Sequence, residues 1–99
     1  PEALSSNERR AAIVWKHFFE VCAKTPTKYV LDSNDVGTVL AADEGSAPYR
    51  QTVRRVMDRV ADLGKEYIDL QKVDGRNALV IDRVEFERLA EELASENQA

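Results

Sequence analysis

Cysteine, histidine, proline and glycine are all scarce in this 99-residue sequence, which has one Cys, one His, three Pro and four Gly. The lone Cys22 has no partner for an internal disulfide or a CxxC pair, which indicates a reducing compartment. No apolar run approaches the roughly 20 residues that a bilayer-spanning helix needs, and no signal-peptide pattern opens the chain. We therefore expect a cytoplasmic protein with no membrane partner.

The sequence also lacks the groupings that catalysis and metal binding need. His17 and Cys22 are five residues apart on one predicted helix, so they do not face each other. No Gly-rich phosphate loop, HExxH motif or paired-cysteine pattern is present. We expect His17 to be structural and Cys22 to be a small buried hydrophobe, and we expect no enzyme, no metal and no cofactor.

The overall composition is that of one globular domain, since hydrophobic residues make up 43% of the chain and charged residues 32%. We expect a single domain over residues 1–99, ordered from about residue 5 to about residue 94. Residues 1–5 are then a disordered lead-in, and Ser95–Ala99 fray. The net charge of −4 argues against indiscriminate coating of nucleic acid, but it leaves room for one DNA-binding face.

One stretch departs from this acidic balance. Residues 45–60 read GSAPYRQTVRRVMDRV and carry four arginines against one acid, so the segment is about +3. A helix over residues 46–63 would collect on one side Val53, Val56, Met57, Val60 and Leu63. The opposite side would carry Gln51, Arg54, Arg55 and Asp58, with Arg50 and Arg59 on the flanks. Either these arginines form a solvated face paired with nearby acids, or they reach phosphates and base edges of DNA.

An earlier helix is predicted from Ser5, which with Glu8 forms a capping box, to about Lys24. Its expected core face consists of Ala11, Val14, Trp15, Phe18, Val21 and Cys22. Ile13 lies on the other side, with Ala12 and Phe19 at the edge. These leftover apolar side chains are either ordinary surface scatter or a subunit contact.

A short strand and a second helix follow Pro26, which ends the first helix. Tyr29–Leu31 is β-prone, and Asp32, with Asp35 in the first turn, caps a helix that ends near Ala42. Its core face is Val36, Val39 and Leu40. Gly37 inside this helix is unfavourable unless a neighbouring helix or a phosphate approaches closely.

A three-residue turn, Asp43–Gly45, leads into the basic helix. Ser46 is the expected N-cap of that helix and Pro48 lies in its first turn. Gly64 suits the left-handed position at its end.

Asp74-Gly75 predicts a two-residue hairpin turn. Centring the pairing there brings Leu70 opposite Leu79 and Ile68 opposite Ile81, so both apolar pairs share one face of the ribbon. Lys72 and Arg76 lie near the tip. Asp82 and Glu85 then start a last helix with the apolar stripe Phe86, Leu89, Ala90 and Leu93 and an otherwise strongly acidic surface.

The predicted order is helix, short strand, helix, turn, helix, hairpin, helix, in a mostly helical α+β class. This order, over about Ser5 to Leu93, resembles the winged helix-turn-helix domain. The helix-turn-helix is read in DSNDVGTVLAADEGSAPYRQTVRRVMDRVADLG and the wing in KEYIDLQKVDGRNALVID. The third helix ends in VMDRVADLG and leads directly into a strand. This ending is similar to that of many bacterial and archaeal winged-helix regulators.

The resemblance implies that the third helix, residues 46–63, enters the major groove of double-stranded DNA while the wing, residues 67–82, lies on the backbone. Gln51, Arg54 and Arg55 would then reach base edges. Arg50 and Arg59 would reach phosphates, and Ser46 and the helix amides would hold another. The remaining implied contacts are Lys72 and Arg76 at the wing tip, and Tyr49, which is expected to pack first and to touch the backbone second.

Two functions follow from different uses of this fold. The first is a small prokaryotic transcription regulator, a homodimer formed through helix 1 and the C-terminal helix. The alternative is a protein–protein interaction module of a replication, segregation or transcription assembly. The acidic total favours the alternative, as does the start at Pro1, which is the start expected of a processed chain or of a piece of a longer one.

Overall fold

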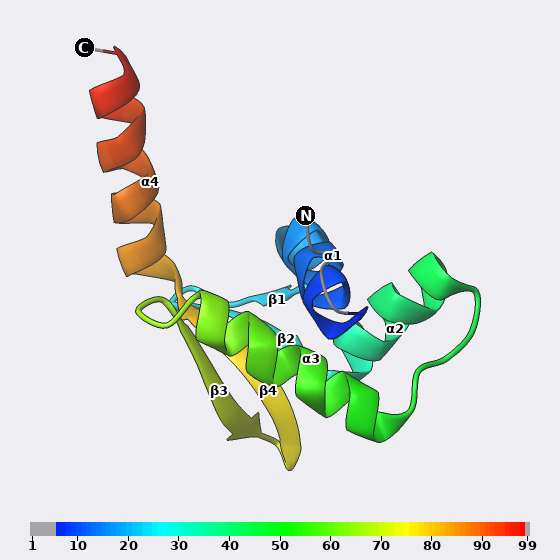
Figure 1. Ribbon diagram of the computed structural model, residues 1–99. Helices are drawn as coiled ribbons and strands as arrows, with labels where there is room; N and C mark the ends of the chain where they lie inside the picture. The colour runs from blue at the N-terminus through cyan, green and yellow to red at the C-terminus, as the bar shows by residue number, and fades with distance from the viewer. Residues whose placement is uncertain (1–5, 99) are drawn as a thin grey trace.

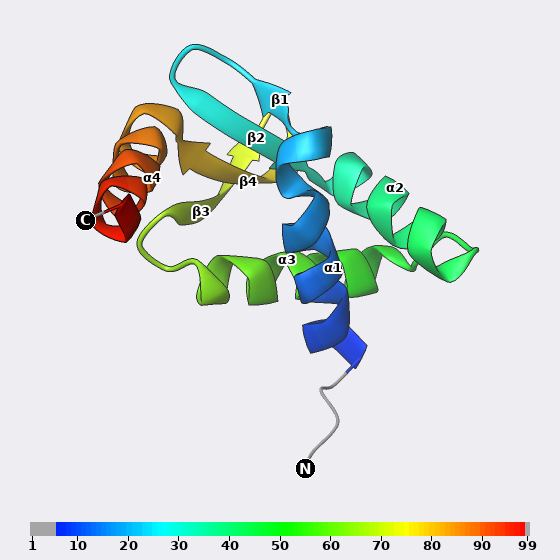
Figure 2. The ribbon, with the colours of Figure 1, turned by 90° about the horizontal axis from the view of Figure 1, so that it is seen from above.

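Three helices pack against one face of a four-stranded antiparallel sheet, and a fourth helix leaves the end of that sheet (Figures 1 and 2). The structure is a computed structural model that describes residues 6–98. Its elements are, in order, α1 (Ser6–Val21), β1 (Ala23–Lys24), β2 (Lys28–Asp32), α2 (Ser33–Glu44), α3 (Arg50–Leu63), β3 (Ile68–Val73), β4 (Arg76–Asp82) and α4 (Arg83–Gln98). The mostly helical α+β class and the order of the main elements are as predicted.

The first helix is shorter than predicted. It ends at Val21 because Ala23 and Lys24 pair as strand β1 with Val30 and Tyr29 of β2. The hydroxyl oxygen of Thr25 accepts hydrogen bonds from the backbone N–H groups of Thr27 and Lys28, at 3.3 and 2.9 Å, and this closes the turn between the two strands. No local sequence pattern indicates a two-residue strand. The predicted cap at Ser5 and the lead-in over residues 1–5 lie outside the described residues.

Helix α2 begins as predicted and ends later than predicted. Asp32 and Asp35 form a reciprocal capping box, in which the Asp32 Oδ1 accepts from the Asp35 N–H at 2.9 Å. The helix continues past Ala42 to Glu44, where Gly45, with φ of +79°, terminates it in the left-handed conformation. The connection to α3 is therefore the five residues 45–49 and not a three-residue turn.

Helix α3 starts at Arg50, so the predicted start at Ser46 is wrong. With Ser46 as N-cap, Ala47 would have to be helical immediately before Pro48, a position where the proline ring disfavours helix. Tyr49 is the N-cap instead, in an extended conformation and without a side-chain hydrogen bond. At the other end, Gly64 has φ of −105° and is not left-handed.

Gly64 is needed for a different reason from the predicted one. A Cβ on this residue would lie 2.4 Å from the Cδ1 of Ile68, so the chain can pass over that side chain only without a side chain of its own. The glycine thus allows α3 to lead closely into β3.

The hairpin has the predicted turn and register. Ile68 pairs with Ile81 and Leu70 with Leu79, and Asp74 and Gly75 both have positive φ, as a two-residue turn between twisted strands requires. Strand β4 also pairs with β2 on its other edge, and this makes it the buried centre of the sheet.

The core lies between this sheet and the first three helices. Its fully buried large side chains include Phe18, Leu31, Leu40, Met57, Leu79 and Ile81. Ala11, Val14 and Cys22 are buried as predicted, whereas Trp15 is 41% exposed and Leu63 is 70% exposed.

Helix α4 differs from the other three helices because none of its described residues is buried. It starts on the predicted cap, with Asp82 Oδ1 accepting from the Glu85 N–H at 3.0 Å. It then runs away from the body (Figure 1) and remains helical to Gln98, so the predicted fraying from Ser95 is not seen there. Across the described residues, no helix has the length and apolar character needed to cross a bilayer.

Candidate nucleic-acid interface

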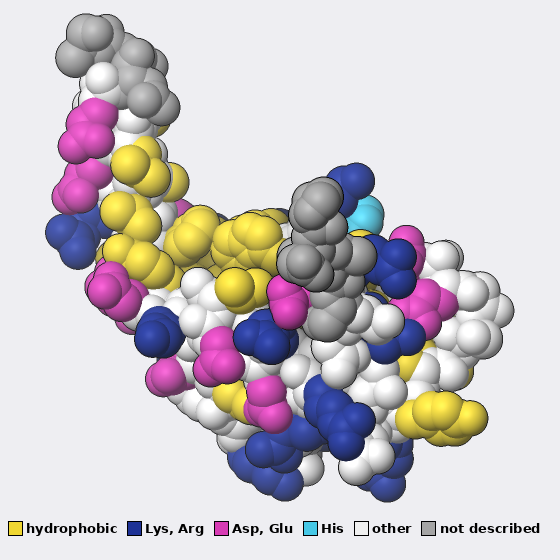
Figure 3. Space-filling model, viewed as in Figure 1, with side chains coloured by type: hydrophobic (Ala, Val, Ile, Leu, Met, Phe, Trp, Pro, Cys, Tyr) yellow, Lys and Arg dark blue, Asp and Glu magenta, His cyan; other side chains and the backbone are white. Residues whose placement is uncertain are grey.

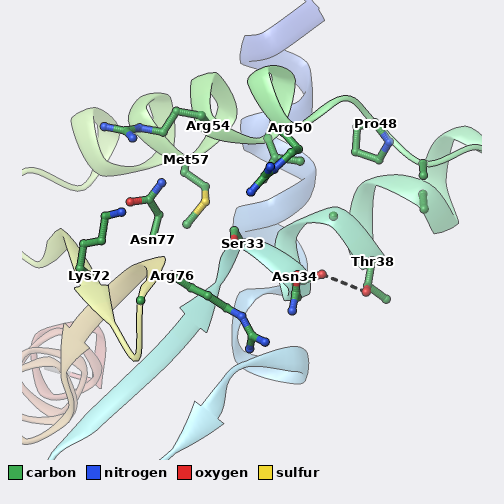
Figure 4. A pocket seen from close by; sticks show the side chains of 15 residues that line it. Ser33, Asn34, Thr38, Pro48, Arg50, Arg54, Met57, Lys72, Arg76 and Asn77 are labelled. Atoms are coloured by element: carbon green, nitrogen blue, oxygen red, sulfur yellow. Dashed lines mark hydrogen bonds between the residues drawn. The ribbon is translucent and has the colours of Figure 1, made fainter.

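A groove of about 700 Å³ lies between α2, the first half of α3 and the tip of the β3–β4 hairpin (Figure 4). The buried side chains of Val53 and Met57 border it from α3. These two residues belong to the hydrophobic core, so the groove lies directly against that core. Its outer walls are polar.

Four cations line this groove and no carboxylate does. Arg50 and Arg54 come from α3, while Lys72 and Arg76 come from the hairpin, and Figure 4 shows them on opposite sides of the space. Figure 3 shows Lys and Arg side chains gathered along the same edge of the molecule. Four of the nine predicted contact residues, far apart in sequence, are therefore brought together.

The partners of these cations differ. The Arg54 Nε lies 3.3 Å from Asp58 Oδ1, one helical turn further along α3, and the pair is half exposed. Arg76 lies 3.6 Å from the carboxylate of Asp32. Within the described part of the chain, Arg50 and Lys72 have no ion pair or hydrogen bond, so their charge is available to an anion.

The other predicted contact residues do not line the groove. Gln51, Arg55 and Arg59 are exposed on α3, which leaves them accessible on the adjoining surface. Ser46 lies in the loop before α3, so it does not cap the helix that was expected to hold a phosphate. Tyr49 is 86% exposed, and the prediction that it packs first against the core is wrong.

Four polar residues of the groove were not predicted as contacts. Ser33, Asn34 and Thr38 come from α2, and Asn77 pairs with Lys72 across the hairpin. The signal for the α2 residues was available in the sequence. The side of α2 away from its core face carries, at helical spacing, Asn34, Gly37, Thr38 and Ala41. None of these residues is charged, so their composition does not indicate an anion contact.

The N-terminus of α2 is not itself a free anion site, because its own acids occupy it. Asp35 Oδ2 accepts from the Asp32 N–H at 3.1 Å and completes the capping box. Burial raises the pKa of Asp35, although the hydrogen bond from the Asp32 backbone acts in the opposite direction. Any anion in the groove must therefore rely on the lateral face of α2 and on the cations across from it.

A second surface, apolar instead of basic, lies between α1 and α4 (Figure 3). The rings of Trp15 and Phe19 on α1 are in edge-to-face contact, with their centroids 5.6 Å apart. The ring centroids of Phe19 and Phe86 of α4 are 5.1 Å apart. Phe19 is thus the centre of an aromatic cluster and not surface scatter. Beyond Phe86, the helical stripe continues through Leu89 to Leu93, which is 52% exposed. We call this the α1–α4 surface.

One polar cluster fixes the base of α4. Glu87 accepts hydrogen bonds at 2.9 Å from both Arg83 Nε and the hydroxyl of Tyr29. The Arg83 bond, followed by the Tyr29 bond, lowers the pKa of Glu87. The same bond to Glu87 raises the pKa of Tyr29. Arg83 also donates to the Thr25 carbonyl at 3.0 Å, so the first two turns of α4 are anchored to the body.

Residues with catalytic or metal-binding chemistry are dispersed. His17 Nδ1 lies 3.2 Å from Glu20 on the surface of α1. Cys22 is buried, as predicted, and burial raises the pKa of its thiol. The described residues contain no group of three or more His, Cys, Asp or Glu side chains able to hold a metal ion.

The groove and the α1–α4 surface are therefore the two features from which function can be argued. The groove offers unpaired cations on a rigid support, and the α1–α4 surface offers apolar area on a projecting helix. Comparison with known proteins adds no relative to this argument, since no protein-family model, no curated protein and no solved structure matches the chain.

Proposed function

We propose that this protein is a small winged-helix transcription regulator that binds double-stranded DNA with the groove and the exposed side of α3. The observation that carries the proposal is the set of four cations from two separate elements around one groove that has no acid in its lining. An acidic chain of net charge −4 that concentrates positive charge in this way has the charge distribution of a domain that touches nucleic acid with one face.

In the proposed complex α3 lies in the major groove. Arg54, Arg55 and Gln51 reach base edges, since Arg pairs with guanine and Gln with adenine there. Arg50 and Arg59 contact phosphates on either side. The β3–β4 hairpin acts as the wing and brings Lys72 and Arg76 to the backbone or the minor groove. Tyr49 is exposed beside Arg50, which supports a contact to the backbone in this complex. Ser46 lies before the start of α3, so the helix amides do not form a phosphate site with it.

Asp58 is an acid on the proposed reading face, and Asp62 follows it one turn later on the same side of α3. The ion pair of Asp58 with Arg54 supports a positioning role, because the pair holds the guanidinium along the helix until DNA competes for it. The pair is half exposed and costs little to break, since exposed ion pairs contribute at most about 1 kcal/mol.

The test is fluorescence anisotropy with mixed-sequence duplex DNA at two salt concentrations. If about six phosphates are neutralised per domain, the log–log slope of affinity against salt is roughly −5. Replacing both Arg54 and Arg55 by Ala should lower the affinity by roughly a hundredfold, at about 1–3 kcal/mol for each lost contact. Arg88→Ala on α4 is the matched control. Absence of binding at low salt would remove the proposal.

We further propose that two copies act together through the α1–α4 surface. Each copy offers both a projecting apolar helix and an apolar hollow beside α1 (Figure 3), which is what a two-fold, self-complementary contact requires. Exposed apolar area of this kind marks interaction sites on proteins. A dimer that separates the two α3 helices by about 34 Å would fit consecutive turns of the major groove.

Sedimentation measurements on Leu89→Asp/Leu93→Asp test the dimer. The wild-type protein should sediment as a dimer and the variant as a folded monomer, because the carboxylates would be buried unpaired at the contact. A monomeric wild-type protein would exclude the dimer but would leave the DNA-binding face untouched.

The alternative function, a winged-helix module that binds another protein, is favoured by the same α1–α4 surface and by the acidic charge of the chain. The two functions differ in one outcome. A regulator loses binding to its target when the groove cations are removed, whereas an interaction module loses it when Trp15 and Leu93 are replaced.

A further inference from the structure

The wall of the groove formed by α2 has an unusual composition. Asn34, Gly37, Thr38 and Ala41 face the groove from successive turns of the helix, and together they supply no charge and little bulk. Across from them stand Arg50 and Lys72, the two groove cations that have no partner among the described residues. Small side chains on one wall leave space for an anion beside the unpaired cations. Because this wall carries no negative charge, it does not repel that anion.

Gly37 supplies an independent indication. Glycine is the least favourable residue other than proline in a helix interior, so its presence calls for a reason. The packing of the protein does not provide one, because a Cβ on Gly37 would meet no atom within 4 Å. The close approach that this glycine permits is therefore not used by the described residues and is open to a bound molecule.

The size and chemistry of the groove indicate which class of molecule could bind there. A volume of about 700 Å³ is far larger than a water molecule needs and is open to an extended chain. Thr38 donates its hydroxyl to the Asn34 carbonyl at 3.0 Å and can rotate toward a new acceptor. Hydroxyl and amide groups, together with Arg and Lys, are the ordinary donors to phosphate oxygens.

We infer that α2 forms a second, separate wall of the DNA site, and that one backbone phosphodiester lies over Gly37, between the side chains of Asn34 and Thr38 and the cations Arg50 and Lys72. Arg76, which lies 3.6 Å from the Asp32 carboxylate, offsets the charge of that acid beside the groove. The inference rests on the proposed DNA binding. It adds a phosphate contact made by α2 through uncharged residues.

The first test is Gly37→Ala. The added methyl meets open space in the free protein and improves helix propensity, so the Tm should rise by roughly 2–6 °C. The same methyl should obstruct the phosphate and lower the affinity for duplex DNA by about tenfold, the cost of one charge-assisted hydrogen bond. A more stable protein that binds DNA less well is a combination that loss of folding cannot produce.

The second test compares Thr38→Glu with Ala42→Glu. Both variants add one carboxylate to the exposed surface of α2, but only position 38 lines the groove. Thr38→Glu should lower DNA affinity at least about tenfold and should reduce the magnitude of the salt slope by about one, as expected for one lost phosphate. Ala42→Glu should change the affinity by less than about threefold, which is the effect of distant charge alone.

The outcomes separate this inference from the function on which it rests. If the wild-type protein binds duplex DNA and Gly37→Ala and Thr38→Glu bind as tightly as wild type, the α2 wall is not a phosphate site while DNA binding stands. If the wild-type protein does not bind DNA at all, the proposed function itself fails. Reduced affinity of both variants with an unchanged Ala42→Glu protein supports the inference.

Discussion

The groove and the α1–α4 surface lie on the same small domain, but they are built in opposite ways. The groove is polar and positively charged, and core residues of α3 form its base, so its shape is fixed by packing that exists without a ligand. The α1–α4 surface is apolar, and the helix that supplies half of it buries none of its described residues. A preformed basic groove suits a charged, regular ligand, whereas a projecting apolar helix suits a partner that completes its packing.

Neither surface is explained by the stability of the fold, which is why we propose a different binding partner for each. The ion pairs of the groove cations contribute little to the stability of this fold, because Arg54–Asp58 and Arg76–Asp32 are surface pairs. Unpaired arginines beside a groove are therefore not explained by folding. Exposed leucines on an otherwise acidic helix are not explained by folding either, and in isolation they reduce solubility.

The largest expected effect comes from reversing one charge of the groove. Arg50→Glu should lower the affinity for duplex DNA by more than about a hundredfold, because it removes an attractive contact and places a carboxylate near phosphate. Arg88→Glu on α4 is the matched reversal and should change affinity by less than about threefold. Anisotropy titrations measure both. Equal losses in the two variants would mean that only net charge matters and that the groove is not the binding site.

The next effect divides α4 into an anchored and a free part. Phe86→Ala should lower the free energy of unfolding by about 2–3 kcal/mol, since this side chain packs on Phe19 and Tyr29. Leu93→Ala should change it by less than about 0.5 kcal/mol in a monomer, because surface positions contribute little. Urea titrations at protein concentrations below dimerisation test this. A large loss for Leu93→Ala would show that α4 packs elsewhere.

The smallest effect is the pH dependence of the base of α4. The pKa of Glu87 is lowered in the folded protein, so its contribution to stability is complete above the ordinary value of 4.5 and is lost as the pH falls through the lowered value. Wild type should therefore have a higher Tm than Glu87→Gln at pH 6, and the difference should vanish in stronger acid. Glu91→Gln, which removes a carboxylate without a partner in the described chain, should show no such difference. A Tm gap that persists in acid would refute the linkage.

Local signals were sufficient to predict much of this fold. The Asp32 cap, the Asp74-Gly75 turn and the pairing of Ile68 with Ile81 depend on neighbouring residues or on strict alternation, so a single sequence specifies them. The start of α3 is also decided locally, because the effect of Pro48 on Ala47 outweighs the N-cap preference of Ser46. The two-residue strand β1 depends on pairing with β2 and has no local pattern of its own.

The groove was predictable only in part. Charge and helical spacing identified Arg50 and Arg54, and the hairpin register identified Lys72 and Arg76. The contribution of α2 was missed because Asn34 and Thr38 are ordinary surface residues until the fold places them opposite those cations. The exposure of Trp15 and Leu93 could not be predicted either, because periodicity shows which residues share a face and does not show whether another element covers that face.

The central claim is that duplex DNA binds the groove and not the α1–α4 surface, and amide chemical shifts measured by NMR during a DNA titration test it most directly. We expect the largest changes over residues 33–41, 50–59 and 72–77, with residues 86–93 and the indole N–H of Trp15 unchanged. Changes confined to Trp15 and α4, or no changes at low salt, would contradict the account.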